Sequence, residues 1–141
     1  MQQFVEFVGN HPFLWMAFAA VLGMIIFTEY SRVASGVTGL SPFAATQLLN
    51  KGDALVVDVR DEKEFKAGHV LNARNLPVSS LDKRLVEIDK FKEKNVVLYC
   101  DNGMRASRAA SKMKKNGFTQ LHTITGGVGA WEKANLPLVS K

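Results

Sequence analysis

Hydrophobic and polar positions divide the chain into one uniformly apolar segment and a longer segment of alternating character. Between Glu6 and Glu29 there is no Asp, Glu, Lys or Arg, and residues 12–27 are apolar on every side of a helix. A helix of this length crosses a hydrocarbon core of about 30 Å, whereas a surface helix of a soluble domain carries a polar stripe. We therefore predict a transmembrane anchor over residues 1–30, with the span at about 8–28.

Aromatic and charged residues flank this segment. Trp15 and Tyr30 lie near its ends, where amphipathic rings favour the headgroup zone. No Lys or Arg precedes the span, and Arg32 and many lysines follow it. The positive-inside rule predicts a single pass through the inner (cell) membrane with the C-terminal domain in the cytoplasm. A cleaved signal peptide is the alternative, because residues 33–36 include small side chains, but a signal peptide begins with a positive region that this chain lacks.

After the anchor, short apolar runs alternate with segments of helical periodicity. We predict strands over residues 54–59, 73–76, 96–99 and 121–125, and helices over 42–49, 62–66, 80–91 and 106–115. Continuous apolar runs are typical of strands buried on both faces. Strands that alternate with helices predict an α/β fold, an open and mostly parallel sheet flanked by helices.

The boundaries follow from composition and length. Residues 31–37 are mostly small or polar, and we interpret them as a flexible linker. The domain then occupies residues 38–138, and residues 139–141 form a tail. A chain of 141 residues holds one such domain and little else.

Charge and cysteine content narrow the possible partners. The net charge is +5, and the lysines are scattered along the sequence. This distribution is typical of a solvated surface, so we expect no nucleic-acid partner, although contact with anionic lipid headgroups fits an anchored domain. The chain's one cysteine, Cys100, cannot form an internal disulfide, which agrees with a reducing compartment.

Cys100 lies where a predicted strand gives way to a predicted helix. The carboxyl ends of parallel strands are where sites form in such sheets. A loop that curls into a helix start directs backbone N–H groups inward, and these groups stabilise an anion such as a thiolate or a persulfide. We predict that Cys100 is a nucleophile held over this loop. The loop consists of Asp101, Asn102, Gly103, Met104 and Arg105.

The loop residues support a reactive thiol. Gly103 permits the tight turn, and Arg105 supplies a positive charge that holds the loop or an anionic substrate. Ser107 caps the following helix or donates a hydrogen bond to the bound anion. The alternative is that Cys100 is a small apolar residue, buried and inert at a strand end.

A set of short motifs in a fixed order resembles the rhodanese family. The matching residues are Val57, Asp58, Val59, Arg60, Glu64, Phe65, Gly68, His69, Val70, Ala73, Asn75, Pro77, Tyr99, Cys100, Gly103, Arg105, Ser107, Gly126, Gly127 and Trp131. With its apolar N-terminal span, the chain is similar to the membrane-anchored, single-domain rhodaneses of bacteria. The resemblance implies a sulfurtransferase with a rhodanese-like sheet, in which Cys100 carries a persulfide and residues 101–105 cradle it.

The resemblance also implies supporting roles for three residues before the loop. We expect Asp58, Arg60 and His69 to hold the scaffold, with Arg60 paired to Glu64 or to Asp58 and His69 bonded to backbone. It implies no cofactor and no metal ion.

One position departs from the family pattern. Rhodaneses that use thiosulfate often carry a basic residue just after the cysteine, and here that residue is Asp101, followed by the neutral Asn102. A carboxylate beside the cradle repels a dianion. The expected partners are therefore a small persulfide or a protein persulfide, together with the membrane and a possible membrane-protein partner.

Two other functions remain open from the sequence. Phosphatases and arsenate reductases of related fold need a Cys-x5-Arg loop that is wide enough for a tetrahedral oxyanion, whereas this chain has Cys-x4-Arg. The other alternative is a membrane-tethered interaction module that has the rhodanese fold and little or no turnover.

Overall fold

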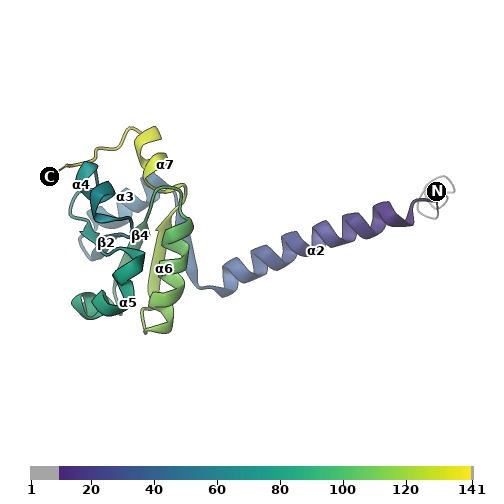
Figure 1. Cartoon of the computed structure of the whole chain (residues 1–141), viewed down its shortest axis with the longest axis horizontal. Helices are drawn as coiled ribbons and strands as arrows, with labels where there is room; N and C mark the ends of the chain where they lie inside the picture. The colour runs from purple at the N-terminus through teal and green to yellow at the C-terminus, as the bar shows by residue number, and fades with distance from the viewer. Residues whose placement is uncertain (1–9, 141) are drawn as a thin grey trace. The chain divides into compact units, whose positions relative to one another are not determined.

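The computed structural model describes residues 10–140, which fall into two compact units divided at Gly36 (Figure 1). The first residues of the predicted anchor (1–9) and the last residue of the predicted tail (141) lie outside the described residues. The first unit contains helix α2 (Pro12–Ala34), and the second begins at Val37.

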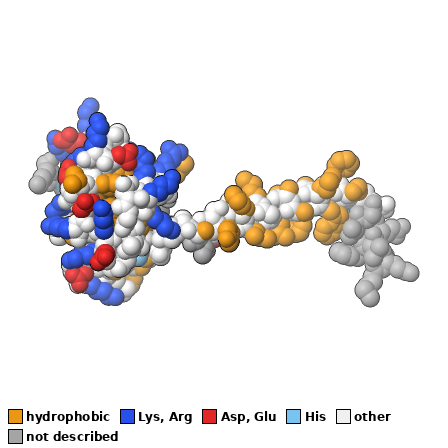
Figure 2. Space-filling model, turned by 90° about the horizontal axis from the view of Figure 1, so that it is seen from below, with side chains coloured by type: hydrophobic (Ala, Val, Ile, Leu, Met, Phe, Trp, Pro, Cys, Tyr) orange, Lys and Arg blue, Asp and Glu red, His pale blue; other side chains and the backbone are white. Residues whose placement is uncertain are grey.

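Helix α2 has the length and composition of a membrane span. Between Pro12 and Ser31 its mean hydropathy is 1.8, and none of its residues is buried. Hydrophobic side chains lie along most of its length (Figure 2). The Thr28 hydroxyl donates to the Ile25 carbonyl at 2.8 Å, so this polar group is satisfied inside the helix. Among residues 10–140, α2 is the one helix that is long and apolar enough to cross a bilayer.

The second unit is built on a parallel sheet, as predicted, and this sheet has five strands, one more than the four that the sequence predicted. Its order is β1-β5-β4-β2-β3. The strands are β1 (Val37–Leu40), β2 (Ala54–Asp58), β3 (Arg74–Asn75), β4 (Asn95–Tyr99) and β5 (Gln120–Ile124). Because every pair is parallel, all five carboxyl ends lie along one edge of the sheet and all five amino ends along the other.

Helices cover both faces of the sheet and bury alternate side chains of the strands. One face packs against α5 (Leu81–Arg84), η2 (Leu85–Phe91) and α6 (Met104–Lys115). The other face packs against α3 (Pro42–Asn50) and α7 (Gly127–Lys133). In β4, Val96 and Leu98 belong to the first core and Val97 and Tyr99 to the second. Cys100 continues this alternation and lies in the first core, under α6.

Two segments differ from the sequence-based expectation. The linker predicted over residues 31–37 is shorter, since α2 extends to Ala34 and Val37 already pairs with β5. The helix predicted over residues 80–91 is divided into η1 (Val78–Ser80), α5 and η2. The physical reason is the spacing of its apolar residues. Those in η2 follow one another at intervals of three, which places them on one side of a 3₁₀-helix. They are Leu85, Ile88 and Phe91.

Smaller differences concern the ends of elements. The strand predicted over residues 73–76 forms pairs only at Arg74 and Asn75, at the sheet edge. Helix α6 begins at Met104, two residues earlier than predicted, because the chain already turns at Gly103. Helix α4 (Glu62–Ala67) begins at Asp61 with a capping box, in which the Asp61 N–H donates to the Glu64 carboxylate at 3.1 Å.

Candidate functional site

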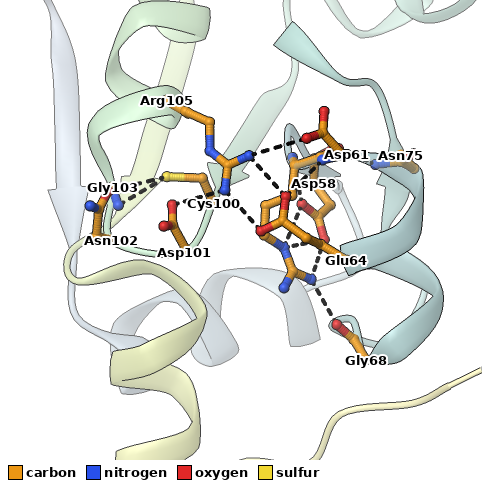
Figure 3. Close-up of polar contacts among 11 residues, drawn as sticks. Asp58, Asp61, Glu64, Gly68, Asn75, Cys100, Asp101, Asn102, Gly103 and Arg105 are labelled. Carbon is orange, nitrogen blue, oxygen red and sulfur yellow. Dashed lines mark hydrogen bonds and ion pairs between the residues drawn. The ribbon is translucent and has the colours of Figure 1, made fainter.

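The sulfur of Cys100 lies directly after the carboxyl end of β4, at the start of a loop that turns into α6 (Figure 3). The Gly103 N–H donates to Cys100 Sγ at 3.0 Å. Gly103 has a φ of 99°, a left-handed conformation that favours glycine and aims this N–H back at the sulfur. The predicted inward amide is therefore present at Gly103.

The rest of the predicted cradle differs from expectation. The Asn102 side chain accepts the Met104 N–H at 3.1 Å through Oδ1, and this oxygen lies 3.9 Å from Cys100 Sγ. Cys100 itself has no exposed surface. The thiol is thus covered, and one of the amides expected to face it is occupied by the Asn102 side chain. Met104 belongs to the loop through its backbone, because its side chain is 62% exposed.

The start of α7 fixes the outer side of the loop. Val128 N–H donates to the Cys100 carbonyl at 2.8 Å, and Gly129 N–H donates to the Asp101 carbonyl at 3.3 Å. Gly127, with a φ of 60°, lies so close that a Cβ there would overlap both carbonyl oxygens. These bonds hold the two carbonyls toward α7.

Arg105 is bound by carboxylates from two elements (Figure 3). Its two terminal nitrogens each lie 2.9 Å from a Glu64 oxygen, a bidentate pair. Nη2 also lies 3.1 Å from the Asp101 carboxylate, and Nη1 lies 4.0 Å from that of Asp61. Hydrogen bonding to Glu64, ahead of that to Asp101, raises the pKa of Arg105. Arg105 therefore holds the loop, the first of the two roles considered for it.

Two carboxylates of this network, those of Glu64 and Asp101, have a pKa below the ordinary range. The hydrogen bond from Arg105 lowers the pKa of Glu64 and outweighs the opposing effect of burial. Burial raises the pKa of Asp101, but hydrogen bonds from Arg105 and from the Asn102 backbone outweigh it and lower the pKa overall. Both groups stay ionised at neutral pH. We call Asp61, Glu64, Asp101 and Arg105 the loop entrance, which places three carboxylates around one guanidinium.

A buried ion pair between Arg60 and Asp58 lies beside the loop entrance. Arg60 Nη2 lies 2.6 Å from the Asp58 carboxylate and 2.7 Å from the Gly68 carbonyl, and Asp58 is completely buried. Burial alone would lower the pKa of Arg60, but its hydrogen bond and charge pairing with Asp58 raise it. Of the two partners predicted for Arg60, the structure selects Asp58. Since Asp58 ends β2 and Gly68 follows α4, the pair fixes α4 against the sheet.

His69 and Ser107 also bind backbone. His69 Nδ1 lies 2.8 Å from the Phe65 carbonyl, which confirms the predicted backbone bond. The backbone of His69 pairs with Val139 through two hydrogen bonds of 2.8 Å, so Val139 belongs to the domain and not to the predicted tail. The Ser107 hydroxyl donates to the Gly103 carbonyl at 3.0 Å. It therefore neither caps α6 nor faces the sulfur, because Ser107 already lies inside the helix.

Comparison with known proteins identifies the family. The rhodanese-like domain matches residues 41–134, which is more than half of the chain. The chain belongs to the rhodanese-like family. It is 37% identical to the protein YibN of Escherichia coli strain K12 over 140 residues, covering 99% of this chain and 98% of that one.

Solved structures place the same fold on the second unit. A rhodanese-related protein from Thermoplasma volcanium superposes with a TM-score of 0.65 at 22% identity, over 74% of this chain and 99% of that one. A thiosulfate sulfurtransferase from Pseudomonas aeruginosa gives 0.68 at 18% identity, over 81% of this chain and 22% of that one. At these identities the likeness concerns the fold alone.

Sequence reasoning missed two features of this rhodanese-like site. Glu64 pairs with Arg105 instead of Arg60. A signal for this pairing was available, because Glu64 follows β2 and Arg105 follows β4, and neighbouring parallel strands bring their carboxyl ends together. The occupation of the Met104 N–H by Asn102 had a weaker signal, namely that Asn side chains commonly bond the backbone two residues ahead.

Proposed function

We propose that the protein is a membrane-anchored sulfurtransferase that carries sulfane sulfur as a persulfide on Cys100. The observation that supports this most directly is the Gly103 N–H, which donates to Cys100 Sγ at 3.0 Å at the carboxyl end of β4 in a rhodanese-like domain. A fixed N–H dipole at this distance stabilises negative charge on sulfur.

The proposed reaction moves one sulfur atom in two displacements. The Cys100 thiolate attacks the outer sulfur of a donor R–S–SH. The S–S bond of the donor breaks, R–S⁻ leaves, and Cys100–S–SH forms. An acceptor thiolate then attacks the outer sulfur of this persulfide and regenerates the Cys100 thiolate. Each step is a thiol–disulfide type exchange that conserves electrons, so no oxidant or cofactor is required.

The charge of the entrance favours a persulfide over thiosulfate as the donor. Arg105 already pairs with Glu64 and Asp101, so its charge is not available to a substrate anion. A thiosulfate dianion would have to approach three carboxylates and one guanidinium, a net negative surface. A low-molecular-weight persulfide or a protein persulfide brings less negative charge to the sulfur.

The covered thiol implies an opening step. Because Cys100 has no exposed surface, a donor reaches the sulfur only when the exposed part of the loop moves aside. The Asn102 side chain is the natural moving part, since its rotation would uncover Sγ and release the Met104 N–H. Together with the Gly103 N–H, that amide could then bind the outer sulfur of the persulfide.

For location, we propose that α2 crosses the inner (cell) membrane once and that the rhodanese-like domain is cytoplasmic. The length and apolar composition of α2 between Pro12 and Ser31 support the span. The excess of Lys and Arg after the span supports the orientation.

Mass spectrometry of the Cys100 peptide tests the proposal. The full-length protein is incubated with a low-molecular-weight persulfide or with thiosulfate, then analysed before and after reduction. We expect one additional, reducible sulfur with the persulfide donor and much less with thiosulfate. Cys100→Ser should gain none and should lose all transfer to cyanide. Equal transfer by wild type and Cys100→Ser would refute the enzymatic proposal.

The covered thiol also favours a second candidate, a tethered interaction module with little or no turnover. The two candidates differ in the Asn102→Ala variant. If Asn102 gates a working enzyme, its removal should leave sulfur loading intact or faster. If the domain is only a module, neither wild type nor this variant should take up sulfur from any donor.

A further inference from the structure

The amino edge of the sheet has a charge opposite to that of the loop entrance. We define the amino edge as residues 51–53, 89–94 and 114–119, which lead into β2, β4 and β5. It carries six lysines and three carboxylates. The lysines are Lys51, Lys90, Lys92, Lys94, Lys114 and Lys115, and the carboxylates are Asp53, Asp89 and Glu93. All of the lysines are exposed except Lys92, which is half-buried and pairs with Asp89 at 3.1 Å.

These segments form one surface because the strands begin in one row. Ala54 pairs with Asn95, and Asn95 pairs with Gln120. Side chains and backbone also join the segments directly. Thr119 donates to the Lys92 carbonyl from its N–H at 3.0 Å and from its hydroxyl at 3.1 Å.

An aromatic ring lies within this basic surface. The ammonium groups of Lys90 and Lys94 lie 5.3 Å and 6.0 Å from the ring centroid of the half-buried Phe91. Lysine stems and an aromatic ring beside one another offer apolar area with cationic tips, which suits an anionic interface.

The chain enters the domain at this same edge. Val37, the first residue of β1, pairs with Leu121 in the row where β5 begins. Only two residues, Ser35 and Gly36, separate it from the last residue of α2, Ala34. Three residue steps reach at most about 11 Å, comparable to the Debye length of about 8–10 Å in physiological salt. The point at which the chain enters the domain is therefore tethered within this distance of the end of α2.

We propose that the amino edge binds anionic lipid headgroups. This inference rests on the membrane anchoring in the proposed function, but not on the sulfur chemistry. Anionic lipid is favoured over other polyanions because the tether keeps a lipid surface within reach at all times. The contact would hold the amino edge at the membrane and leave the opposite edge, with Cys100, to soluble partners.

Energy transfer from a probe on the domain to lipid headgroups tests this inference. In full-length protein with Cys100→Ser, a donor dye is attached at Thr119→Cys on the amino edge or at Ser79→Cys beyond the carboxyl end of β3. The protein is placed in nanodiscs of phosphatidylcholine alone or mixed with phosphatidylglycerol, each with a headgroup-linked acceptor. We expect transfer from position 119 to rise with phosphatidylglycerol, to fall at high salt, and to exceed transfer from position 79.

A charge-matched pair of variants sharpens the test. Lys51→Gln with Lys94→Gln should lower the ratio of bound to unbound domain about 25-fold, since each lysine near an anionic surface contributes about 1 kcal/mol. Lys63→Gln with Lys66→Gln removes the same charge from α4 and should change that ratio less than about twofold.

Several outcomes would overturn the inference. The first is energy transfer that does not depend on lipid charge. The second is an equal loss of membrane-bound domain in both variant pairs. The third is binding of soluble RNA or acidic protein at position 119 in place of lipid. A protein that fails to float with vesicles would refute the anchoring and this inference together. A protein that floats but shows no response to lipid charge would refute only this inference.

Discussion

The two edges of the parallel sheet differ in charge, in the exposure of their side chains and in the partners of their cations. At the carboxyl edge, Arg105 and Arg60 are each held by carboxylates, and the thiol of Cys100 is covered. At the amino edge, the lysines are mostly exposed and two of them flank a ring. The comparison shows that the two arginines of the carboxyl edge bind other parts of the domain, whereas most lysines of the amino edge are exposed on its surface.

Breaking the buried ion pair between Asp58 and Arg60 at the carboxyl edge should have the largest effect on stability. Asp58→Asn keeps the shape of the side chain but leaves the Arg60 guanidinium buried without its counter-charge. We expect the free energy of unfolding to fall by about 3–5 kcal/mol, measured by chemical denaturation of the full-length protein. Glu62→Gln is the control, because Glu62 forms an exposed pair with Lys66, and it should cause no measurable change. Similar losses in both variants would refute this role of the buried pair.

The contact between α7 and the cysteine loop should come next. Gly127→Ala places a Cβ against the carbonyl oxygens of Cys100 and Asp101 at a positive φ. We expect a loss of about 2–3 kcal/mol in unfolding free energy and slower sulfur loading, because the loop must shift. Gly129→Ala is the matched control, since its Cβ would meet the Asp101 carbonyl at an ordinary 3.6 Å. If both variants behave like wild type, Gly127 does not position the loop.

Freeing the guanidinium at the entrance should change donor preference. Glu64→Gln removes one carboxylate and its bidentate pairing with Arg105, while the amide oxygen can still accept the Asp61 N–H. We expect kcat/KM for thiosulfate to rise about tenfold, from the order of a charge interaction at short range, with little change for a neutral persulfide. Glu62→Gln, the same charge change outside the network, should raise it less than about twofold. An equal rise for both donors would contradict an electrostatic cause.

The Glu64 pair should also leave a small signature in the pH dependence of stability. The pKa of Glu64 is lowered in the folded state, so its contribution is complete above the unfolded value of about 4.5 and is lost as pH falls through the folded value. Its side chain is 37% exposed, which limits the contribution to about 0.5 kcal/mol. The difference between wild type and Glu64→Gln should stay constant from pH 7 to about pH 5 and shrink below pH 4.5. A difference that grows on acidification would have the wrong sign.

The smallest effect is expected when lysines of the amino edge are replaced and sulfur loading at the carboxyl edge is measured. Lys51→Gln with Lys94→Gln should leave sulfur loading in detergent unchanged and should alter the unfolding free energy by less than about 0.5 kcal/mol. The residues are exposed and share no contacts with the loop. A large loss of activity would show that the two edges are coupled.

Local signals predicted the fold and the position of the cysteine loop. Continuous apolar runs marked β2 and β4. The alternation of side chains between the two faces of β4 also indicated that Cys100 is buried, because Val96, Leu98 and Cys100 face one core. Burial was the alternative to a reactive thiol at this position, since a strand end can equally face solvent.

The partner of each ion pair was harder to predict, because the paired residues come from segments that are far apart in the chain. Glu64 and Arg105 are 41 positions apart and meet only through the register of β2 with β4. Two carboxylates were within sequence reach of Arg60, and only the folded position of α4 decides between them. The division of residues 78–91 into three short helices had a local signal, the spacing of Leu85, Ile88 and Phe91 by three residues, but this spacing also fits one face of an α-helix.

The pairing of Val139 with His69 joins the last residues of the chain to the segment after α4. This pairing holds the C-terminal residues against the segment that supports the cysteine loop. Shortened versions should keep Val139, and a fused partner or affinity tag is best separated from it by a spacer. A pull on the C-terminus would otherwise act on the pairing of Val139 with His69.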